Sequence, residues 1–340
     1  MIVTYIRSSS YGNYDFCQMQ YFMTYVLGYR SESGKKAQQG TACHKVMECL
    51  AACKKELQDN PDSKTLSITD DALGQLEFTP RKLGTKKFVA QLMKDSYEHY
   101  TSQDSHKYYP ADFRFCEKQV ETALTFNEGQ FDPRNRNIVD TEPTFDIEIE
   151  EDWAKYEYEM PDGSTIKGNL AIKGTIDLVT KIDDNVIEVV DWKTGQRKNW
   201  ATGEVKTYEK LLDDAQLLLY NYAISKLYPD YEQAIMSIFF TRDGGPFSMC
   251  FDKSDQDRFL GMLRKRYEEI KDNIKPRPIS SSRRDFRCQK LCHFYKNNWP
   301  GTNTTMCEYV EKKLHTIGHD KTLKECTNEG FNIGYYEAPG

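Results

Sequence analysis

The sequence contains no apolar run near the roughly 18 residues that a membrane-spanning helix needs. Its first residues, MIVTYIRSSSYGNYDFC, lack the hydrophobic stretch of a secretory signal peptide. No GxxxxGK[ST] phosphate-binding loop occurs, so there is no sign of an ATPase or helicase motor. Internal repeats and low-complexity segments are absent as well. We therefore expect a protein with no membrane association and no motor of its own.

Positive charge is not in excess either. The 46 Lys and Arg residues stand against 52 Asp and Glu residues, which gives a formal net charge of −6. A general nucleic-acid-binding surface is therefore not expected, and any such binding would need a local basic groove. The segment from Asp140 to Asp162 is acidic enough to repel phosphates, so we place it in an outer strand or an excursion away from any substrate.

Cysteine, in contrast, is plentiful, with ten residues among 340. Without a signal peptide, this number predicts a reducing compartment and metal ligation rather than disulfides. The bacterial cytoplasm, that of a phage-infected host cell, or another reducing compartment would satisfy this condition. Three of the cysteines follow one another near the C-terminus with C-x3-C-x14-C spacing: Cys288, Cys292 and Cys307.

Three thiolates are one ligand short of a tetrahedral or cubane metal site. Cys17, which lies in an aromatic helical pattern over residues 8–30, could supply the fourth, with His293 and Cys326 as less favoured alternatives. A small buried thiol is the alternative interpretation of Cys17. A shared metal would tie the N-terminal helix to the C-terminal loop across most of the chain.

Two runs of β-branched residues between Gly174 and Lys193 flank the turn-prone sequence Asp183-Asp184-Asn185. This pattern predicts an antiparallel hairpin with Asp177 directly across from Asp191, about 5 Å away at Cβ. Lys193 follows Asp191 by two residues and points to the same face. Two carboxylates and an ammonium then converge at one end of the hairpin.

That combination suits metal-assisted phosphodiester hydrolysis. Magnesium and similar hard cations accept one or two carboxylates together with phosphate oxygens. Lys193 can orient the attacking water or offset developing negative charge. A surface hairpin with solvated charges is the alternative, and the Asp-x-Lys pattern alone favours that alternative.

Two predicted helices carry further polar residues. Residues 36–55 form a helix entered after Gly40-Thr41, with His44 and Glu48 on one face, and His44 is either a metal ligand or a packing residue. Residues 213–228 form a helix capped by one of two aspartates, and its polar stripe is either a substrate contact or a rim: Gln216 and Tyr220.

The remaining segments receive simpler assignments. We expect loop and turn over 57–76, helix over 79–100, a strand region over 111–128, and a polar loop over 194–212. Strands at 234–245 and 246–252 form a second hairpin before an amphipathic helix at 257–274.

Several pieces, in family order, resemble the PD-(D/E)XK nuclease superfamily: SSYGNYDFCQMQYFMTYVLG, GTACHKVME, GTIDLVTK, EVVDWKTGQ and QLLLYNYA. The resemblance runs from about Ser8 to Cys307, with gaps. It is to the RecB-like branch with a C-terminal cysteine cluster, which includes the AddB nuclease domain, the eukaryotic single-strand exonucleases of mitochondria and replication, and the CRISPR adaptation nuclease.

The resemblance implies roles for individual residues. His44, Asp177 and Asp191, joined by the carbonyl of Trp192, match ligands of one or two Mg²⁺ or Mn²⁺ ions. Lys193 matches the active-site lysine. Gln216 and Tyr220 match the helix motif that contacts substrate near the scissile phosphate.

The cysteine block departs from the family pattern. Iron–sulfur members have one early cysteine and then C-x2-C-x5-C, whereas this chain has C-x3-C-x14-C. Cys17 matches the early position. We favour a 4Fe–4S cluster on four cysteines, with a structural Zn²⁺ as the alternative: Cys17, Cys288, Cys292 and Cys307.

The resemblance further implies an α/β fold, with a central mixed sheet flanked by helices. We expect four parts: an N-terminal helix at 1–30, a helical region at 31–110 forming a wall or arch, a nuclease core at 111–275, and a cysteine-rich metal-binding block at 276–340.

The expected activity is a metal-dependent deoxyribonuclease, an exonuclease on single-stranded ends, acting in DNA recombination, repair or replication with a possible protein partner. Two alternatives remain. One is a nuclease-fold adaptor subunit of a recombination or CRISPR-adaptation complex, and the other is an RNA nuclease. A phage origin is suggested by the compact architecture without a motor.

Overall fold

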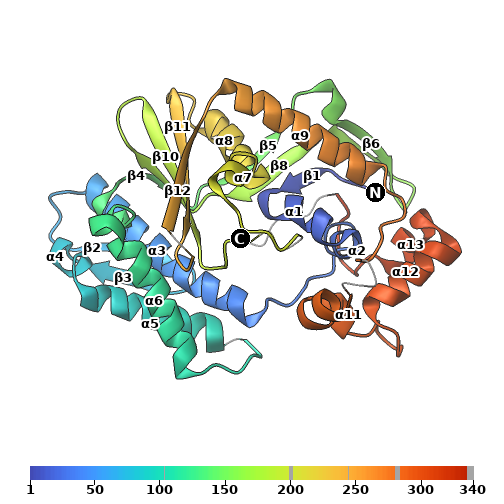
Figure 1. Cartoon of the computed structure of the whole chain (residues 1–340), viewed down its shortest axis with the longest axis horizontal. Coiled ribbons are helices and arrows are strands. Elements are labelled where there is room, and N and C mark those ends of the chain that lie inside the picture. The colour runs from blue at the N-terminus through green and yellow to red at the C-terminus, as the bar shows by residue number, and fades with distance from the viewer. Residues whose placement is uncertain (103, 199–201, 244, 280–283, 335–340) are drawn as a thin grey trace.

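The computed structural model describes residues 1–102, 104–198, 202–243, 245–279 and 284–334 (Figure 1). Within these ranges the strands are β1 (Tyr5–Arg7), β2 (Leu66–Asp70), β3 (Gly74–Phe78), β4 (Asn137–Thr141), β5 (Thr144–Glu148), β6 (Lys155–Glu159), β7 (Thr165–Asn169), β8 (Ala171–Thr175), β9 (Leu178–Lys181), β10 (Val186–Lys193), β11 (Gln233–Phe240) and β12 (Gly245–Phe251).

The α-helices in the same ranges are α1 (Ser8–Phe16), α2 (Gln18–Tyr21), α3 (Lys35–Asp59), α4 (Pro80–Leu83), α5 (Lys86–Ser102), α6 (Pro110–Thr125), α7 (Tyr208–Leu212), α8 (Ala215–Leu227), α9 (Lys253–Lys271), α11 (His293–Lys296), α12 (Met306–Ile317) and α13 (His319–Cys326). Short π- and 3₁₀-helical turns are η1 (Phe22–Val26), η2 (Phe126–Gly129), η3 (Pro133–Asn135), η4 (Asp152–Ala154) and η5 (Arg284–Leu291).

The main sheet has the strand order β12-β11-β10-β9-β4, in which β10 and β11 are parallel and the other pairs antiparallel. This confirms the predicted mixed sheet. The predicted hairpin is also confirmed, because β9 pairs with β10 and Val190 lies opposite Leu178. One step further along this register brings Asp191 to Asp177.

A second, smaller sheet has the order β1-β8-β5 and continues the first. The chain passes from β8 into β9 and from β4 into β5, and these two connections remain hydrogen-bonded to each other. The Glu142 N–H donates to the Asp177 carbonyl at 3.3 Å, and the Ile176 N–H donates to the Pro143 carbonyl at 3.1 Å. Asp177 therefore lies where the two sheets part.

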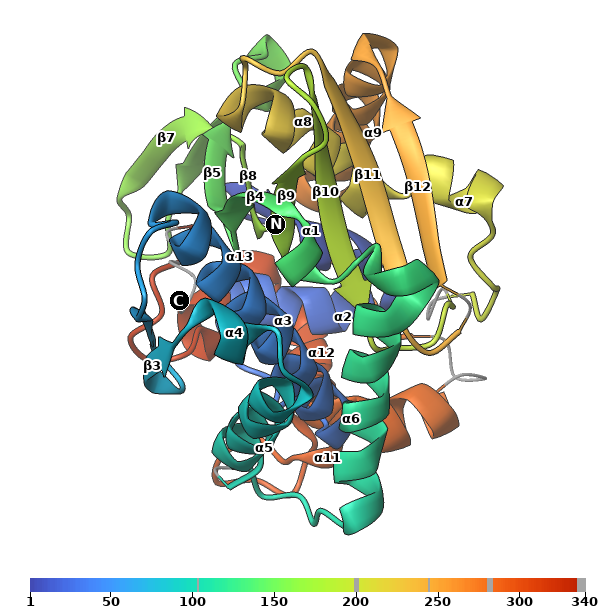
Figure 2. The same ribbon diagram turned by 90° about the vertical axis from the view of Figure 1, so that its left-hand side faces the viewer.

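Side chains on the two faces of β10 pack into two different hydrophobic clusters. Ile187 and Val189 belong to a cluster that includes α8 and α9, whereas Val190 and Trp192 belong to a cluster with α3, α5 and α6. Successive strand residues point to opposite faces, so each face of the sheet carries its own helical layer. Figures 1 and 2 show α8 and α9 on one side of β10–β12 and α3, α5 and α6 on the other.

Two assignments from the sequence are wrong. Residues 110–125 form helix α6 rather than a strand, and they bury Cys116, Val120, Ala123 and Leu124 at helical spacing. Its aromatic residues favoured a strand, but Pro110 begins the helix and Asp112 accepts a hydrogen bond from the Tyr109 N–H.

The other wrong assignment is the loop at 57–76. Within it, β2 and β3 form a hairpin whose turn is closed by Asp70, because its Oδ1 accepts from the N–H groups of Ala72 and Leu73. The expected helical region at 31–110 thus contains a small sheet. Helix α3 begins at Lys35, before the predicted entry at Gly40-Thr41.

The expected helices at 8–30, 79–100, 213–228 and 257–274 are present, although the first breaks at Cys17 and the second at Gly84. Asp214 caps α8, as one of the two predicted alternatives. Part of the loop expected at 194–212 lies outside the described residues, and its end forms α7. No described helix has the length and apolarity to cross a membrane.

A charged residue lies inside the main sheet. Glu188 on β10 is 5% exposed and forms an ion pair with Arg136, whose guanidinium also donates to Thr180 Oγ1 at 2.9 Å. Ser237 on β11 donates a second hydrogen bond to Glu188. Arg136 therefore neutralises a carboxylate that could not otherwise remain ionised in the sheet.

We expect Arg136→Ala to lower the free energy of unfolding by about 3–5 kcal/mol, because it leaves the Glu188 carboxylate buried without its counter-charge. Urea denaturation followed by circular dichroism measures this change. Lys181→Ala is the matched control, since its ion pair with Asp184 is exposed on the same hairpin and should leave the midpoint unchanged. Equal midpoints for the two variants would contradict the structural role of Arg136.

Candidate active site

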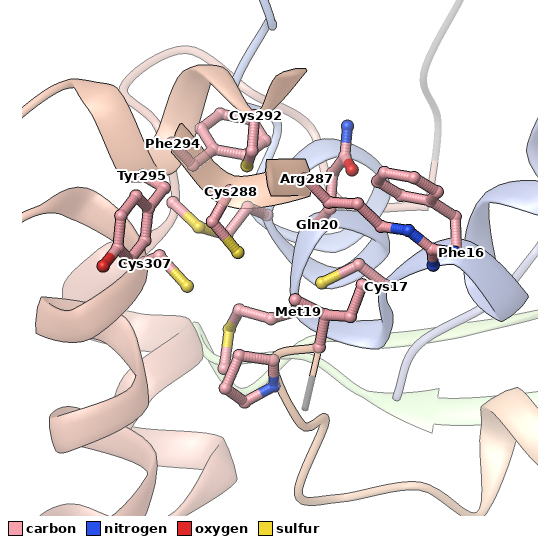
Figure 3. A pocket seen from close by; sticks show the side chains of 13 residues that line it. Phe16, Cys17, Met19, Gln20, Arg287, Cys288, Cys292, Phe294, Tyr295 and Cys307 are labelled. Atoms are coloured by element: carbon pink, nitrogen blue, oxygen red, sulfur yellow. The ribbon is translucent and has the colours of Figure 1, made fainter. Parts of the chain in front are cut away.

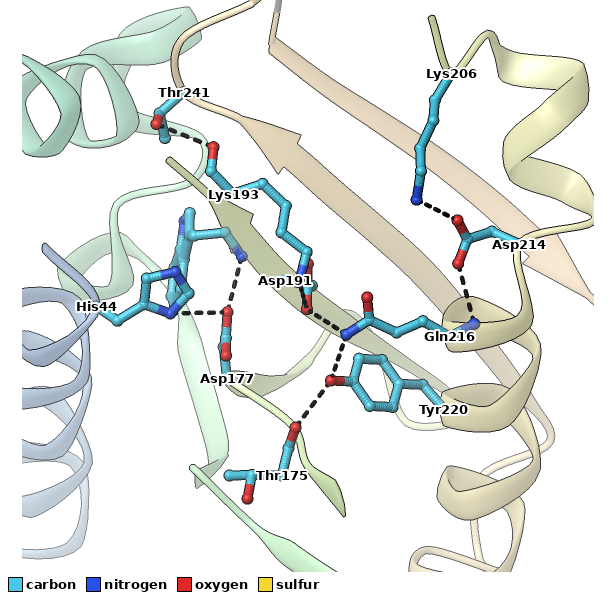
Figure 4. Close-up of polar contacts among 11 residues, drawn as sticks. His44, Thr175, Asp177, Asp191, Lys193, Lys206, Asp214, Gln216, Tyr220 and Thr241 are labelled. Atoms are coloured by element: carbon cyan, nitrogen blue, oxygen red, sulfur yellow. Dashed lines mark hydrogen bonds and ion pairs between the residues drawn. The ribbon is translucent and has the colours of Figure 1, made fainter. Parts of the chain in front are cut away.

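The C-terminal end of β10 carries Asp191 and Lys193 on one face (Figure 4). Lys193 Nζ lies 2.9 Å from Asp191 Oδ1 and 2.8 Å from Oδ2. Asp191 is 1% exposed, whereas the lysine side chain is about one third exposed at 31%. The lysine thus stands between a buried carboxylate and the solvent.

Asp177, directly before the first residue of the neighbouring strand β9, is held by two groups. The Trp192 N–H donates to Asp177 Oδ2 at 2.9 Å, and His44 Nδ1 lies 3.4 Å from the same oxygen. Helix α3 can bring His44 this close because Gly40 faces the end of β10. A Cβ at Gly40 would lie 2.9 Å from Thr194 Oγ1, tighter than ordinary contact.

Helix α8 contributes the third side of the site. The N-cap Asp214 accepts from the Gln216 N–H at 3.0 Å, which fixes the first turn. Gln216 Nε2 then donates to the Tyr220 hydroxyl at 2.9 Å and reaches Asp191 Oδ1 at 3.5 Å. The Tyr220 hydroxyl donates onward to the Thr175 carbonyl at 2.9 Å.

The charges of the site are set by burial and by each other. Burial raises the pKa of Asp191 to about 6, against the opposing effect of Lys193. Burial would lower the pKa of Lys193, but the neighbouring carboxylates raise it above its usual range, so the ammonium persists at neutral pH. Burial disfavours the charged forms of both His44 and Asp177. Their mutual attraction outweighs this effect, so the pKa of the histidine is raised and the pKa of the Asp177 carboxyl is lowered.

The donor set fits a hard divalent cation. Asp191 Oδ2 is buried and accepts no hydrogen bond of good geometry, although the lysine ammonium lies beside it. The two carboxylates are ligands that magnesium and manganese prefer, and the imidazole of His44 is the softer member of the set. Among the described residues, no three His, Cys, Asp or Glu side chains are grouped closely enough to hold an ion.

Sequence reasoning missed a neighbouring carboxyl pair, Glu48 and Glu142. Burial, the Glu48 charge and the Asp177 charge raise the pKa of Glu142 to about 7, while Lys45 opposes this shift. The ammonium of Lys45 donates to Glu48 at 2.8 Å and to Asp70 at 3.0 Å. Glu48 was visible at i+4 from His44. The expectation that the 140–162 segment lies away from the substrate is wrong for Glu142, because its N–H donates to the Asp177 carbonyl at the junction of the two sheets.

The four predicted cysteines line a single cavity beside α2 and α12 (Figure 3): Cys17, Cys288, Cys292 and Cys307. Cys17 lies between α1 and α2 and has an extended backbone, so it interrupts the helix predicted over residues 8–30. Burial raises the pKa values of Cys292 and Cys307. The described lining includes neither His293 nor Cys326. The thiols share one space without forming a closed ligand set.

We expect Mn²⁺ to raise the melting temperature of the metal-free protein at pH 8. At a Mn²⁺ concentration of 100 times its Kd, binding should add about 2.7 kcal/mol to the free energy of unfolding. The rise should shrink below pH 6. The Asp191 carboxyl then takes up a proton, and protonated His44 adds to the loss, so affinity falls by about tenfold or more per pH unit.

Thermal-shift assays at pH 5.5 and pH 8 measure this effect. Asp191→Asn should abolish the shift at both pH values. Asp184→Asn, in the turn of the same hairpin, is the matched control and should retain it. A shift of equal size at both pH values would contradict the assignment of Asp191 as a ligand.

Comparison with known proteins gives a family but no close relative. No curated protein sequence matches the chain significantly. A solved structure of a candidate exonuclease from Eubacterium rectale is 11% identical, with 84% of this chain and 88% of that chain covered and a TM-score of 0.40. The structure of SSO0001 is 14% identical, with 73% and 93% covered and a TM-score of 0.25. Scores this low add nothing to the assignment.

The family comparison is decisive. The model described as the PD-(D/E)XK nuclease superfamily matches residues 8–296, a span that contains α1, His44, both aspartates, Lys193 and α8. The match covers well over half of the chain, and the protein belongs to the PD-(D/E)XK nuclease superfamily, whose members hydrolyse phosphodiester bonds of nucleic acids.

Proposed function

We propose that the protein is a metal-dependent deoxyribonuclease that removes nucleotides from single-stranded ends. One observation carries this proposal: His44, Asp177 and Lys193 come from α3, from the start of β9 and from the end of β10, and they meet beside the buried Asp191 (Figure 4). No packing requirement explains two carboxylates, an imidazole and an ammonium at this place.

Magnesium or manganese would be held by His44, Asp177 and Asp191 together with the carbonyl of Trp192. When bound, such an ion lowers the pKa of water and polarises a phosphoryl oxygen. The protein's own side chains supply the hydrogen bonds that orient the reacting groups. Because the raised pKa keeps Lys193 protonated, it donates hydrogen bonds to the attacking water or to the charged phosphate rather than acting as a base.

Gln216 and Tyr220 position the other side of the site. Burial raises the pKa of Tyr220, so its phenol stays protonated and keeps donating to the Thr175 carbonyl. That leaves the phenol oxygen to accept from the Gln216 amide, which holds the amide toward Asp191. A substrate phosphate entering beside Asp191 would meet the same amide.

The preference for single-stranded DNA ends rests on the resemblance to the RecB-like branch, and so does a role in recombination, repair or replication. The net charge of −6 agrees with a substrate that enters a local channel rather than lying on an open basic face. All ten cysteines are free thiols, which supports a reducing compartment such as the bacterial or phage-infected cytoplasm.

We further propose that the four cavity cysteines hold a 4Fe–4S cluster: Cys17, Cys288, Cys292 and Cys307. Their side chains enter one cavity from α12, from the N-cap of α11, from the π-helical turn before α11, and from the break after α1 (Figure 3). Burial raises the pKa of Cys292 and of Cys307, so these two thiols must release protons when a metal binds. A structural Zn²⁺ is the alternative on the same thiols.

We expect Asp191→Ala to abolish cleavage of a labelled single-stranded oligodeoxynucleotide in Mg²⁺ or Mn²⁺. Lys193→Ala should lower kcat by about 10²–10³-fold, the loss typical of one transition-state donor. Circular dichroism should show an unchanged fold, and Lys181→Ala is the control on the same hairpin. Full activity of Asp191→Ala would refute the mechanism.

The same assay separates the substrates. A single-stranded DNA, an RNA of equal sequence and a circular single strand are compared. Cleavage of the linear DNA alone supports the proposal, cleavage of the circle shows an endonuclease, and cleavage of the RNA alone shows a ribonuclease.

Protein purified without oxygen should contain about four irons per chain and absorb near 400 nm, with bleaching by dithionite. Cys292→Ser should remove the colour, whereas Cys250→Ser, an exposed thiol on β12, should not. One zinc per chain without colour would select the structural zinc. Absence of both metals would refute the four-cysteine site.

A further inference from the structure

The surface beside α6 carries cations that lack carboxylate partners. Lys36 Nζ lies 4.0 Å from the centroid of the Phe115 ring, and Arg242 Cζ lies 5.9 Å from the same centroid. Within the described part of the chain, neither cation forms an ion pair, and both side chains are exposed. Two positive charges therefore flank one aromatic ring and remain available to an anionic ligand.

This cluster is fixed to the active site. The N–H of Thr241, the residue before Arg242, donates to the Lys193 carbonyl at 3.0 Å. The Thr241 hydroxyl donates to Gln119 Oε1 on α6 at 2.7 Å. Both bonds are inside the molecule, so α6 and the β11–β12 turn keep a constant position relative to the active-site lysine.

A groove runs from the cluster to the proposed metal ligands. It is lined by the first three turns of α3, from Lys36 to His44, and across from them by Thr194 and Gly195. Lys36 precedes His44 by eight residues, about 12 Å along a helix that rises 1.5 Å per residue. A chain of about two to four nucleotides spans this length.

A second aromatic ring lies further out. Tyr109 is 53% exposed, and the ammonium groups of Lys35 and Lys107 lie 5.2 Å and 5.4 Å from its ring centroid. Lys35 is also ion-paired with Asp112 at 2.6 Å. The Tyr109 ring is exposed and the Phe115 ring is partly buried, and aromatic rings beside cations can bind unpaired bases and their phosphates.

The cavity on the opposite side of the active site, beside Gln216, differs in charge. Three of its four cations are neutralised by carboxylates: Lys206 by Asp214 at 2.5 Å, Lys210 by Glu204 at 2.7 Å and Arg266 by Asp15 at 2.6 Å. Lys198 is the fourth, and it is exposed without an ion pair among the described residues. Most of the positive charge in this cavity is therefore paired, and this difference favours the α6 side for a long polyanion.

We propose that Lys36, Tyr109, Phe115 and Arg242, the α3–α6 face, bind the uncut part of a single-stranded nucleic acid. Its phosphates contact the two free cations, and its bases stack on the two rings. This proposal rests on the proposed nuclease function and adds the side from which the strand reaches the active site.

The first test is binding of a fluorescein-labelled oligothymidylate in EDTA, measured by anisotropy over a range of salt concentrations. The double variant Lys36→Ala/Arg242→Ala should lower the slope of log K against log salt by about 1.4, since each single-strand phosphate contact contributes about 0.7. Lys210→Ala removes an equally exposed but neutralised lysine and should leave the slope unchanged. A wild-type slope in the double variant would overturn the proposal.

Stacking is tested by Tyr109→Leu, which is exposed enough to leave folding intact. It should weaken binding to the single strand at least about fivefold. Binding to a blunt duplex of the same length should not change, because paired bases cannot stack on the ring. An equal loss for both ligands would overturn the single-strand assignment.

Kinetics distinguish this proposal from the nuclease function. For the oligothymidylate, the double variant should raise KM at constant kcat, whereas hydrolysis of thymidine 5′-(p-nitrophenyl phosphate), too short to reach Lys36, should be unchanged. If the wild-type protein hydrolyses neither substrate, the nuclease proposal fails and the binding data alone decide the role of the face. If hydrolysis is normal but the variants bind like wild type, only the face is refuted.

Discussion

The site depends on the pairing register of β9 and β10. Val190 opposite Leu178 brings Asp191 next to Asp177, and a slip of one residue would send one of the carboxylates to the other face. The carboxylate of Asp191 is nevertheless unfavourable inside the protein, and its raised pKa expresses that cost. Lys193, two residues further along β10, offsets this cost by forming an ion pair with Asp191. The active site is therefore built around one charged pair on a single strand.

Helices on both faces of the main sheet complete the site. The core under α8 fixes Gln216 and Tyr220, and the core under α3 and α6 fixes His44. Each layer is held by ordinary apolar packing, so the functional residues are carried by elements that are stable for other reasons. Because Gly40 has no side chain, α3 can pack closely against the end of β10.

Charge is distributed unevenly over an acidic molecule. The 140–162 segment places carboxylates on β5 and the β6–β7 hairpin, although Glu142 lies beside Asp177, whereas unpaired cations gather at the start of α3 and the β11–β12 turn. Since screened charges act over only about 8–10 Å at physiological salt, the local surface and not the net charge governs how a phosphate chain is received. An acidic protein can therefore bind nucleic acid along one groove.

The sequence alone determined the β9–β10 hairpin, its register and the common face of Asp191 and Lys193, because strand alternation and turn chemistry are local properties. It also predicted α8 with its cap at Asp213 or Asp214, and through the family resemblance it singled out His44 and the four cysteines. The helix α6 was mistaken for a strand because aromatic content outweighed the Pro110 start signal, and the β2–β3 hairpin was hidden by its polar residues.

Only the tertiary structure decided which distant groups meet. Glu142 lies beside Glu48 and Asp177 because two sheets bend at the same point, and Phe115 lies between Lys36 and Arg242 because α6 packs against α3 and the β11–β12 turn. Such contacts join residues from separate segments of the chain, and no periodicity within either segment encodes them. Their positions follow from how the layers pack, which is a property of the whole chain.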